Sequence, residues 1–284
     1  MPDRRFGVST HLFHNRRLTR DDLVEVAAHG FDAVEVFATR SHFDYRDPAA
    51  VSELREWLND THLTLHSLHA PVMDAMRGGQ WVGSFSIASG DEPRRKAAVE
   101  ETQAALGLAA SIPFQYLVLH LGMPNGQRIP AGDNQPDAAR RSVVELVDAA
   151  ATVNVKVALE VMPNALSGAD ALVHAIEESL DGVDVGICLD YGHAHLMTAV
   201  ADAVETVAGH LWTTHIHDNN GKRDDHLVPY AGSINWDEAM MTTQKIGYDG
   251  MLMFEVGAGG ADAVDVLKRL ARARERLAAT FVTF

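Results

Sequence analysis

The amino-acid sequence predicts a single (β/α)₈ barrel that extends over residues 1–284, and three observations support this prediction. Strand-like and helix-like segments alternate eight times along the chain, which is the element order of a parallel barrel. The predicted strands at 116–120 and 157–160 are almost wholly apolar, as strands buried on both faces are expected to be. No low-complexity linker divides the chain, and 46% hydrophobic content over 284 residues is enough for one large core.

A doubly wound parallel sheet is the main alternative with the same alternation of elements. Proteins of that class carry a Gly-rich phosphate-binding loop after the first strand. The residues that follow the predicted first strand, 6–9, contain no such loop. The barrel is therefore the more economical prediction.

Helix boundaries in the first half of the chain follow from capping residues. Thr19 and Asp22 resemble a capping box at the start of the first helix, and Gly30 ends it. Pro48 lies near the start of the second helix, where proline is well tolerated. The Gly/Ser-rich segment 72–91, which contains Trp81, is predicted to be a long loop able to cover a site.

The remaining elements complete the alternation of strands and helices. The predicted strands are 6–9, 33–37, 63–69, 116–120, 156–160, 183–190, 211–217 and 251–255. The first predicted helix begins at Thr19 and is ended by Gly30. The other predicted helices are 48–59, 92–111, 136–152, 168–179, 199–208, 235–246 and 262–279.

Composition excludes several classes of protein. The net charge of −15 disfavours a nucleic-acid binder, which normally needs a basic face. The single cysteine, Cys188, cannot form an intrachain disulfide, and its position suits core packing better than metal ligation. The N-terminal residues lack the apolar segment of a signal peptide, and no apolar run approaches the length of a membrane span. We therefore expect a cytoplasmic protein.

Histidine and carboxylate side chains lie at the ends of most of the predicted strands. The carboxyl ends of barrel strands converge on one mouth, where active sites lie. Crowding these groups there is costly without a cation to accept their lone pairs. The sequence thus predicts a divalent metal site for Zn²⁺ or Mn²⁺, since mixed imidazole and carboxylate ligands suit both. The nine candidate ligands are His69, His120, Glu160, Asp190, His193, His215, Asp224, His226 and Glu255.

Seven segments around these residues match a known family: SLHAPV (67–72), LVLHLGMP (117–124), ALEVMPN (158–164), CLDYGHAH (188–195), HIHDNNGKRDDHLVP (215–229), SINW (233–236) and MFEVG (253–257). With these segments the chain resembles the xylose isomerase-like TIM barrel superfamily, which includes sugar phosphate isomerases/epimerases and endonuclease IV. One departure from that resemblance precedes the predicted helix at 235–246. The family often has Pro-Gly-Glu-Gly followed by Ile-Asp-Trp, whereas this chain lacks the Glu and has Asn235 in place of the Asp.

The resemblance implies one of two metal sites. In ketohexose-epimerase-like members, residues matching Glu160, Asp190, His215 and Glu255 hold a single metal, and the two glutamates act as the acid/base pair. These four residues are also the strongest subset of the candidates, because they lie on four successive predicted strands. In endonuclease IV-like members, residues matching all nine candidates bind three zinc ions that hydrolyse a phosphodiester.

The first functional hypothesis is a metal-dependent isomerase or epimerase of a small carbohydrate-like substrate. The metal acts as a Lewis acid on a carbonyl, while Glu160 and Glu255 remove and return a proton at the neighbouring carbon. A homo-oligomeric assembly of this protein is compatible with the predicted barrel fold. Lys222 and Arg223 would hold any anionic group of the substrate. The residues predicted to contact the substrate are Glu35, Trp81, His193, His217, Lys222 and Arg223.

The second hypothesis is a phosphodiesterase or phosphatase with several zinc ions, because clustered metals stabilise both oxygens of a displacement. The acidic charge and the few basic residues in the early loops disfavour DNA as its substrate, but not a small phosphate ester. A third hypothesis, a barrel that binds a ligand without turnover, has no specific support in the sequence.

Overall fold

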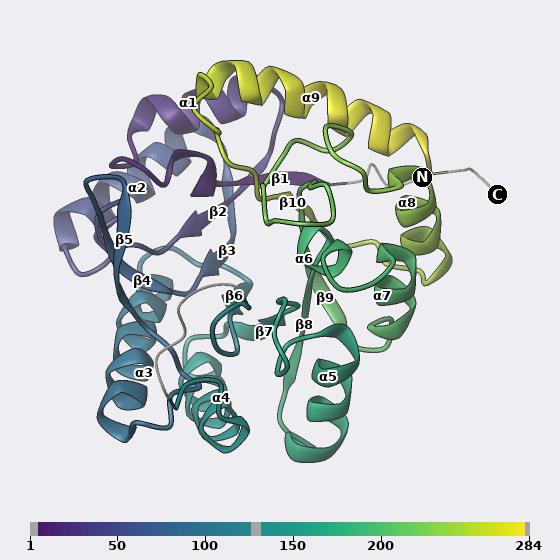
Figure 1. Ribbon diagram of the computed structural model, residues 1–284. Coiled ribbons are helices and arrows are strands. Elements are labelled where there is room, and N and C mark those ends of the chain that lie inside the picture. The colour runs from purple at the N-terminus through teal and green to yellow at the C-terminus, as the bar shows by residue number, and fades with distance from the viewer. Residues whose placement is uncertain (1–4, 126–131, 282–284) are drawn as a thin grey trace.

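The computed structural model describes residues 5–125 and 132–281. Its centre is a closed barrel of eight strands, and each strand pairs in parallel with the next one along the chain. The helices form a ring outside these strands (Figure 1), which confirms the predicted (β/α)₈ barrel. The barrel strands are β1 (Phe6–Ser9), β2 (Ala33–Phe37), β3 (Thr64–His69), β6 (Tyr116–Leu119), β7 (Lys156–Glu160), β8 (Val185–Asp190), β9 (Leu211–Ile216) and β10 (Leu252–Phe254).

The helices begin mostly at the residues that the sequence indicated. Asp22 accepts a hydrogen bond from the Thr19 N–H at 2.9 Å, as a capping box requires. Asp47 and Asp91 cap the next two long helices through their side chains. The helices are α1 (Arg20–Ala28), α2 (Pro48–Thr61), α3 (Glu92–Leu106), α4 (Pro136–Ala151), α5 (Ala169–His174), α6 (Tyr191–His195), α7 (Val200–Thr206), α8 (Trp236–Lys245) and α9 (Ala263–Ala279), with 3₁₀-helices η1 (Thr10–Phe13) and η2 (Gly107–Ala110) and a π-helical turn η3 (Ala175–Ser179).

The prediction of a loop over 72–91 was wrong for most of that segment. It contains an antiparallel hairpin of β4 (Met73–Arg77) and β5 (Gln80–Ser84). Gly78 and Gly79 connect the two strands with φ angles of +58° and +75°, the backbone conformation that a two-residue hairpin turn needs. The glycines that suggested an irregular loop are therefore those of a tight turn.

The hairpin is attached to the loop that follows β2. The Met76 N–H donates to the Ser41 hydroxyl at 3.0 Å, and Arg40 lies 3.8 Å from the Asp74 carboxylate. The hairpin therefore extends from the C-terminal end of the barrel, beside the site described below.

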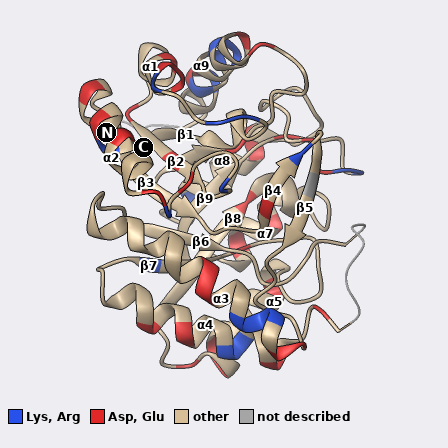
Figure 2. Ribbon diagram, turned by 90° about the vertical axis from the view of Figure 1, so that its left-hand side faces the viewer, with Lys and Arg blue, Asp and Glu red and all other residues tan. Residues whose placement is uncertain are grey.

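The outer surface carries charges of both signs. Figure 2 shows basic residues on outer helices such as α3 and α9, next to acidic ones on the same elements. Among the described residues, no helix is both long enough and apolar enough to cross a membrane. Cys188 is buried against Val118 and Ala158, and burial raises the pKa of its thiol to about 12. The thiol is therefore part of the packed interior.

Candidate metal centre and active site

Four acidic and imidazole side chains meet at the carboxyl ends of four neighbouring strands. Glu160 and Asp190 are the last residues of β7 and β8, His215 is near the end of β9, and Glu255 directly follows β10. The parallel register places His215 beside Asp190 on one side and beside Met253 on the other. One ligand atom from each of the four residues lies within 4.8 Å of the others, and none of the side chains is more than 3% exposed. We call these four residues the central group.

The central group has buried polar atoms without suitable hydrogen-bond partners. Both Glu160 oxygens, Asp190 Oδ2 and His215 Nδ1 make no hydrogen bond of acceptable geometry with the described residues. His215 Nδ1 nevertheless lies 3.5 Å from Glu160 Oε1 and 3.5 Å from Glu255 Oε2. Acceptors that face one another without a proton between them are costly when buried, and a cation relieves that cost. Three carboxylates and one imidazole fit a divalent ion such as Mn²⁺ or Zn²⁺.

A second group shares Glu160 with the first. The Nε2 atoms of His69 and His120 lie 3.2 Å apart, and they lie 3.2 Å and 3.0 Å from Glu160 Oε2. The His69 Nδ1–H donates to the Ala70 carbonyl at 2.9 Å, which directs Nε2 toward Glu160. Two nitrogens on one tetrahedral Zn²⁺ lie about 3.3 Å apart, so this pair also has the spacing of metal ligands.

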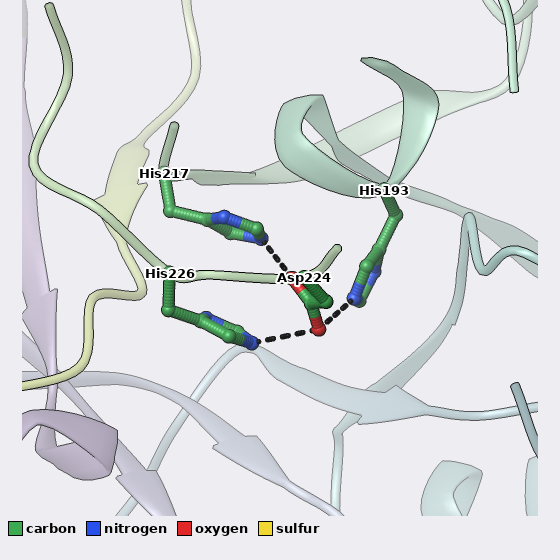
Figure 3. Close-up of side chains that lie close together, drawn as sticks. All are labelled: His193, His217, Asp224 and His226. Atoms are coloured by element: carbon green, nitrogen blue, oxygen red, sulfur yellow. Dashed lines mark hydrogen bonds and ion pairs between the residues drawn. The ribbon is translucent and has the colours of Figure 1, made fainter. Parts of the chain in front are cut away.

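A third group lies beside the central one and is shown in Figure 3. Asp224 Oδ2 lies 3.1 Å from His193 Nε2 and 3.0 Å from His226 Nε2. His217 Nε2 lies 3.6 Å from the other Asp224 oxygen and 3.0 Å from Asp190 Oδ1. Backbone carbonyls orient two of these rings, since His193 Nδ1 lies 3.1 Å from Val161 O and His226 Nδ1 lies 2.8 Å from Glu255 O.

The loop that carries Asp224 and His226 is closed by Asp218. Its backbone exchanges two hydrogen bonds with Leu227, both 2.8 Å long. The Asp218 carboxylate accepts the N–H groups of Asn219 and Ile234 and the indole N–H of Trp236, at 2.8, 3.2 and 2.9 Å. Nothing in the sequence pattern distinguished Asp218 from the neighbouring polar residues. It is fully buried and fixes the loop to the start of α8.

Two further close contacts shape this region. Gly192, in α6, has no space for a side chain, because a Cβ atom there would lie 1.9 Å from His217 Cε1.

Asn235 is the N-cap of α8, and its side chain accepts the Glu238 N–H at 3.4 Å. The Asn that departs from the family pattern therefore still caps the helix.

The two glutamates of the central group differ in their proton affinity. Burial alone would raise the pKa of Glu160, but the imidazoles of His120 and His215 hold it well below its usual range. For Glu255, burial outweighs the nearby imidazoles and, with the Glu160 charge, raises the pKa. Asp224 and Glu160 likewise overcome burial at His226 and His69 and raise the pKa of each imidazole to about 9. One carboxyl that holds its charge beside one that favours a proton is the usual arrangement of an acid/base pair.

A cavity of about 370 Å³ opens above these groups. Glu255 lines it, whereas Glu160, Asp190 and His215 lie beneath the surface. One part of its wall consists of imidazoles and carboxylates, and the other part is apolar, formed by Phe37, Val72, Met73, Met123, Pro124 and Met162.

Two histidines that sequence analysis overlooked also line the cavity. His11 and His14 belong to or follow η1, just after β1, and their rings stack with centroids 4.5 Å apart. The His11 ring also lies 4.6 Å from that of His226. The rule that directed attention to the other strand ends applies to β1 as well, so His11 was accessible to the same reasoning.

Only some of the residues predicted to contact substrate line the cavity. His193 lines the cavity, but Lys222 and Arg223 are exposed and do not, and Arg223 pairs with Asp225 at 3.0 Å. The loop directs both side chains to solvent in this conformation, and their role in holding an anion stays a prediction. His217 is fully buried in the third group and does not line the cavity.

Two other predicted substrate contacts lie elsewhere. Glu35 is fully buried and does not line the cavity, because its side chain lies against His215 and Ser67 inside the barrel. A contact of Glu35 with a substrate hydroxyl therefore stays a prediction, which its buried position does not support. The Trp81 side chain lies outside the described part of the structure.

Fold and site together define a parallel (β/α)₈ barrel with a candidate metal centre at the carboxyl ends of its strands. The profile of the family described as xylose isomerase-like TIM barrel matches residues 23–278. The chain belongs to this family.

Relatives and solved structures agree with that assignment. An uncharacterized protein of Methanocaldococcus jannaschii is 30% identical over 259 residues, which cover 89% of this chain and 84% of the relative. A D-psicose 3-epimerase of Enterocloster bolteae is 26% identical over 242 residues, 81% of this chain and 74% of the relative. The crystal structure of a D-tagatose 3-epimerase-like protein superposes with a TM-score of 0.77 at 26% identity, covering 97% of this chain and 98% of the other.

Proposed function

We propose that the protein is a divalent-metal-dependent isomerase or epimerase of a small carbohydrate-like substrate. The observation that carries the proposal is the central group at the floor of a cavity, in which three buried oxygens and one imidazole nitrogen lack hydrogen-bond partners among the described residues. Glu160, Asp190, His215 and Glu255 would hold the ion. When bound there, a divalent ion supplies Lewis acidity toward a substrate carbonyl.

The two glutamates would move the proton. Glu255 lines the cavity and favours a proton, while Glu160 lies deeper and retains its charge. One carboxylate would remove the hydrogen from the carbon beside the carbonyl, and the other would return a proton on the opposite side of that carbon. Return to the same carbon inverts its configuration. Return to the former carbonyl carbon, with the proton of the adjacent hydroxyl passing to the carbonyl oxygen, isomerises the sugar.

The walls of the cavity fit a substrate with a polar and an apolar side. His69, His120 and His193 would bind hydroxyl groups, whereas Phe37 and the methionines would cover the C–H face of a sugar. The similarity to the D-psicose 3-epimerase and the D-tagatose 3-epimerase-like protein supports the same class of substrate. The cavity of about 370 Å³ is of the size that small-molecule sites have.

Metal analysis and proton exchange test this proposal together. Purified protein should contain one tightly bound divalent ion per chain by elemental mass spectrometry. Incubated in D₂O with a panel of ketohexoses and inososes, it should introduce deuterium beside the carbonyl of at least one, as followed by NMR. Metal-free protein that exchanges hydrogen at the same rate would contradict the proposal.

A second candidate, a multi-metal phosphoesterase, is favoured by one observation. The second and third groups offer ligand atoms within 4.8 Å of one another, so the site has room for more than one ion. The similarity to the D-psicose 3-epimerase and the D-tagatose 3-epimerase-like protein supports the first proposal instead. Two or three bound ions together with cleavage of a small phosphate ester would favour the second candidate.

A further inference from the structure

Glu35 lies inside the barrel directly behind His215. It is the third residue of β2, its side chain is fully buried, and it does not line the cavity. Glu35 Oε2 lies 3.0 Å from His215 Nε2 and accepts the Ser67 hydroxyl at 2.8 Å. The two nitrogens of His215 therefore meet different surroundings, with Glu35 at Nε2 and the carboxylates of the central group at Nδ1.

This arrangement determines which nitrogen can bind a metal. An ionised carboxylate only accepts hydrogen bonds, so Nε2 carries the proton and donates it to Glu35. When the imidazole is neutral, Nδ1 then presents a lone pair toward Glu160 and Glu255, each 3.5 Å away. A carboxylate behind a ligating imidazole holds the ring in one tautomer and orientation and makes the opposite nitrogen a better donor.

A purely structural role does not account for a carboxylate at this position. Among the described residues, Glu35 forms no ion pair with a lysine or arginine, and its Oε1 atom has no hydrogen-bond partner. A buried carboxylate with an unsatisfied oxygen lowers stability relative to an apolar side chain of similar size. Its retention in the barrel interior is explained by its effect on His215.

We propose that Glu35 is a positioning residue that fixes Nδ1 of His215 as the metal-binding nitrogen and strengthens metal binding at the central group. The inference rests on the proposed function, because it requires an ion there. It replaces the role predicted from the sequence, a contact with a substrate hydroxyl, by a role exerted through His215.

Two substitutions separate the charge of Glu35 from its hydrogen bond. Glu35→Gln keeps an oxygen that can accept from His215 Nε2–H but loses the charge, and Glu35→Leu loses both. The matched control is Glu101→Gln, the same change at another buried carboxylate, which binds Tyr45 and Arg46 on the outside of the barrel. Thermal unfolding of the metal-free proteins shows whether each variant is folded.

The readouts are the bound nitrogen and the metal affinity, not the activity. In ¹⁵N NMR spectra of the Zn²⁺-loaded wild type, Nδ1 of His215 should be ligated and Nε2 protonated. Competition with a chelator, followed at the His215 signals, should show Zn²⁺ binding weakened about 10- to 100-fold in Glu35→Leu, less in Glu35→Gln, and unchanged in Glu101→Gln.

The possible failures are distinguishable. If both Glu35 variants are folded and bind Zn²⁺ as the wild type does, or if Nε2 of His215 is the ligating atom, the positioning role is overturned while the proposed function stands. If the wild type binds no divalent ion at the central group, both the proposed function and the positioning role fail.

Discussion

Trp236 donates its indole N–H to the carboxylate of Asp218 over 2.9 Å, and both side chains are buried. The same carboxylate accepts the N–H groups of Asn219 and Ile234. A residue that was inconspicuous in the sequence therefore connects the ligand-bearing loop to α8.

Replacement of Asp218 should destabilise the fold. Asp218→Ala leaves three buried donors without an acceptor, which we expect to lower the free energy of unfolding by about 2–4 kcal/mol. Asp218→Asn keeps one acceptor oxygen and should lose less. Urea denaturation measures both, with the exposed Asp237→Ala as a control that changes little. Equal stability of Asp218→Ala and wild type would show that the loop is held by other contacts.

The metal content of two histidine variants tests the division of the site into groups. His215→Ala removes a ligand of the central group and should lose the bound ion. His120→Ala changes only the second group and should keep that ion while raising the KM for substrate, because His120 lines the cavity. Elemental mass spectrometry and steady-state kinetics measure the two effects. Loss of an ion from His120→Ala would instead favour the multi-metal candidate.

Removal of the proton-transferring carboxyl should stop exchange without emptying the site. Glu255→Gln keeps an oxygen ligand but cannot take up a proton. We expect the rate of substrate hydrogen exchange with D₂O to fall by at least about 100-fold, as is typical for loss of a general acid or base. Metal content measured on the same sample is the control. Exchange at the wild-type rate would assign the proton transfer to another group.

A methyl group at position 192 should displace His217. In Gly192→Ala the new carbon would collide with the His217 ring, which now lies 3.0 Å from Asp190 Oδ1. Overpacking of this kind costs about 1–3 kcal/mol, and we expect weaker metal binding as well because Asp190 belongs to the central group. Gly107→Ala is the matched control, since no atom of the described residues outside its chain neighbours and its own helix lies within 4 Å of the added carbon there. A fully stable, metal-replete Gly192→Ala would show that the ring has room to move.

Acid should destabilise the protein partly through His42, which lies outside the site. His42 is fully buried, and its Nδ1–H donates to the Arg16 carbonyl at 2.7 Å. Burial lowers the pKa of His42 from 6.5 to about 4. Between these two pH values the imidazole is protonated in the unfolded chain and neutral in the folded protein. Its contribution to stability is complete above pH 6.5 and is lost as the pH falls toward about 4.

The corresponding measurement compares stability at two pH values. Between pH 7 and pH 5 the His42 contribution should fall by about 2 kcal/mol. His42→Asn retains a donor for the Arg16 carbonyl and should lose that much less stability over the same range than the wild type. The other histidines are common to both proteins and cancel in the comparison. Parallel pH profiles for the two proteins would contradict the assigned pKa.

The barrel was predictable because its strands are buried on both faces, and such strands leave a plain apolar signal in segments such as 117–119. The candidate site was partly predictable for a related reason. Polar residues at the carboxyl ends of these apolar strands, such as Glu160 and Asp190, face the mouth of the barrel, where active sites lie.

Other features depend on three-dimensional contacts that no local pattern encodes. Lys222 and Arg223 are the cations predicted to hold an anionic group, but the path of the loop directs both to solvent. Glu35 lies deeper in the barrel than the residues that line the cavity. The level of a side chain along the barrel depends on the register of its strand, which the sequence does not reveal. The hairpin was missed because Gly78 and Gly79 indicate a turn and an irregular loop equally well.

The hairpin of β4 and β5 also bears on how such a barrel can diversify. It is inserted after β3, and Val72 and Met73 at its base line the cavity. Hydrogen-bonded and non-hydrogen-bonded pairs alternate along antiparallel strands, so insertion or deletion of two residues in each strand near the turn preserves both the register and the type of pair that the turn closes. Evolution can therefore alter the length of this ribbon, and with it the reach of the protein over a bound molecule, without changing any residue of the barrel itself.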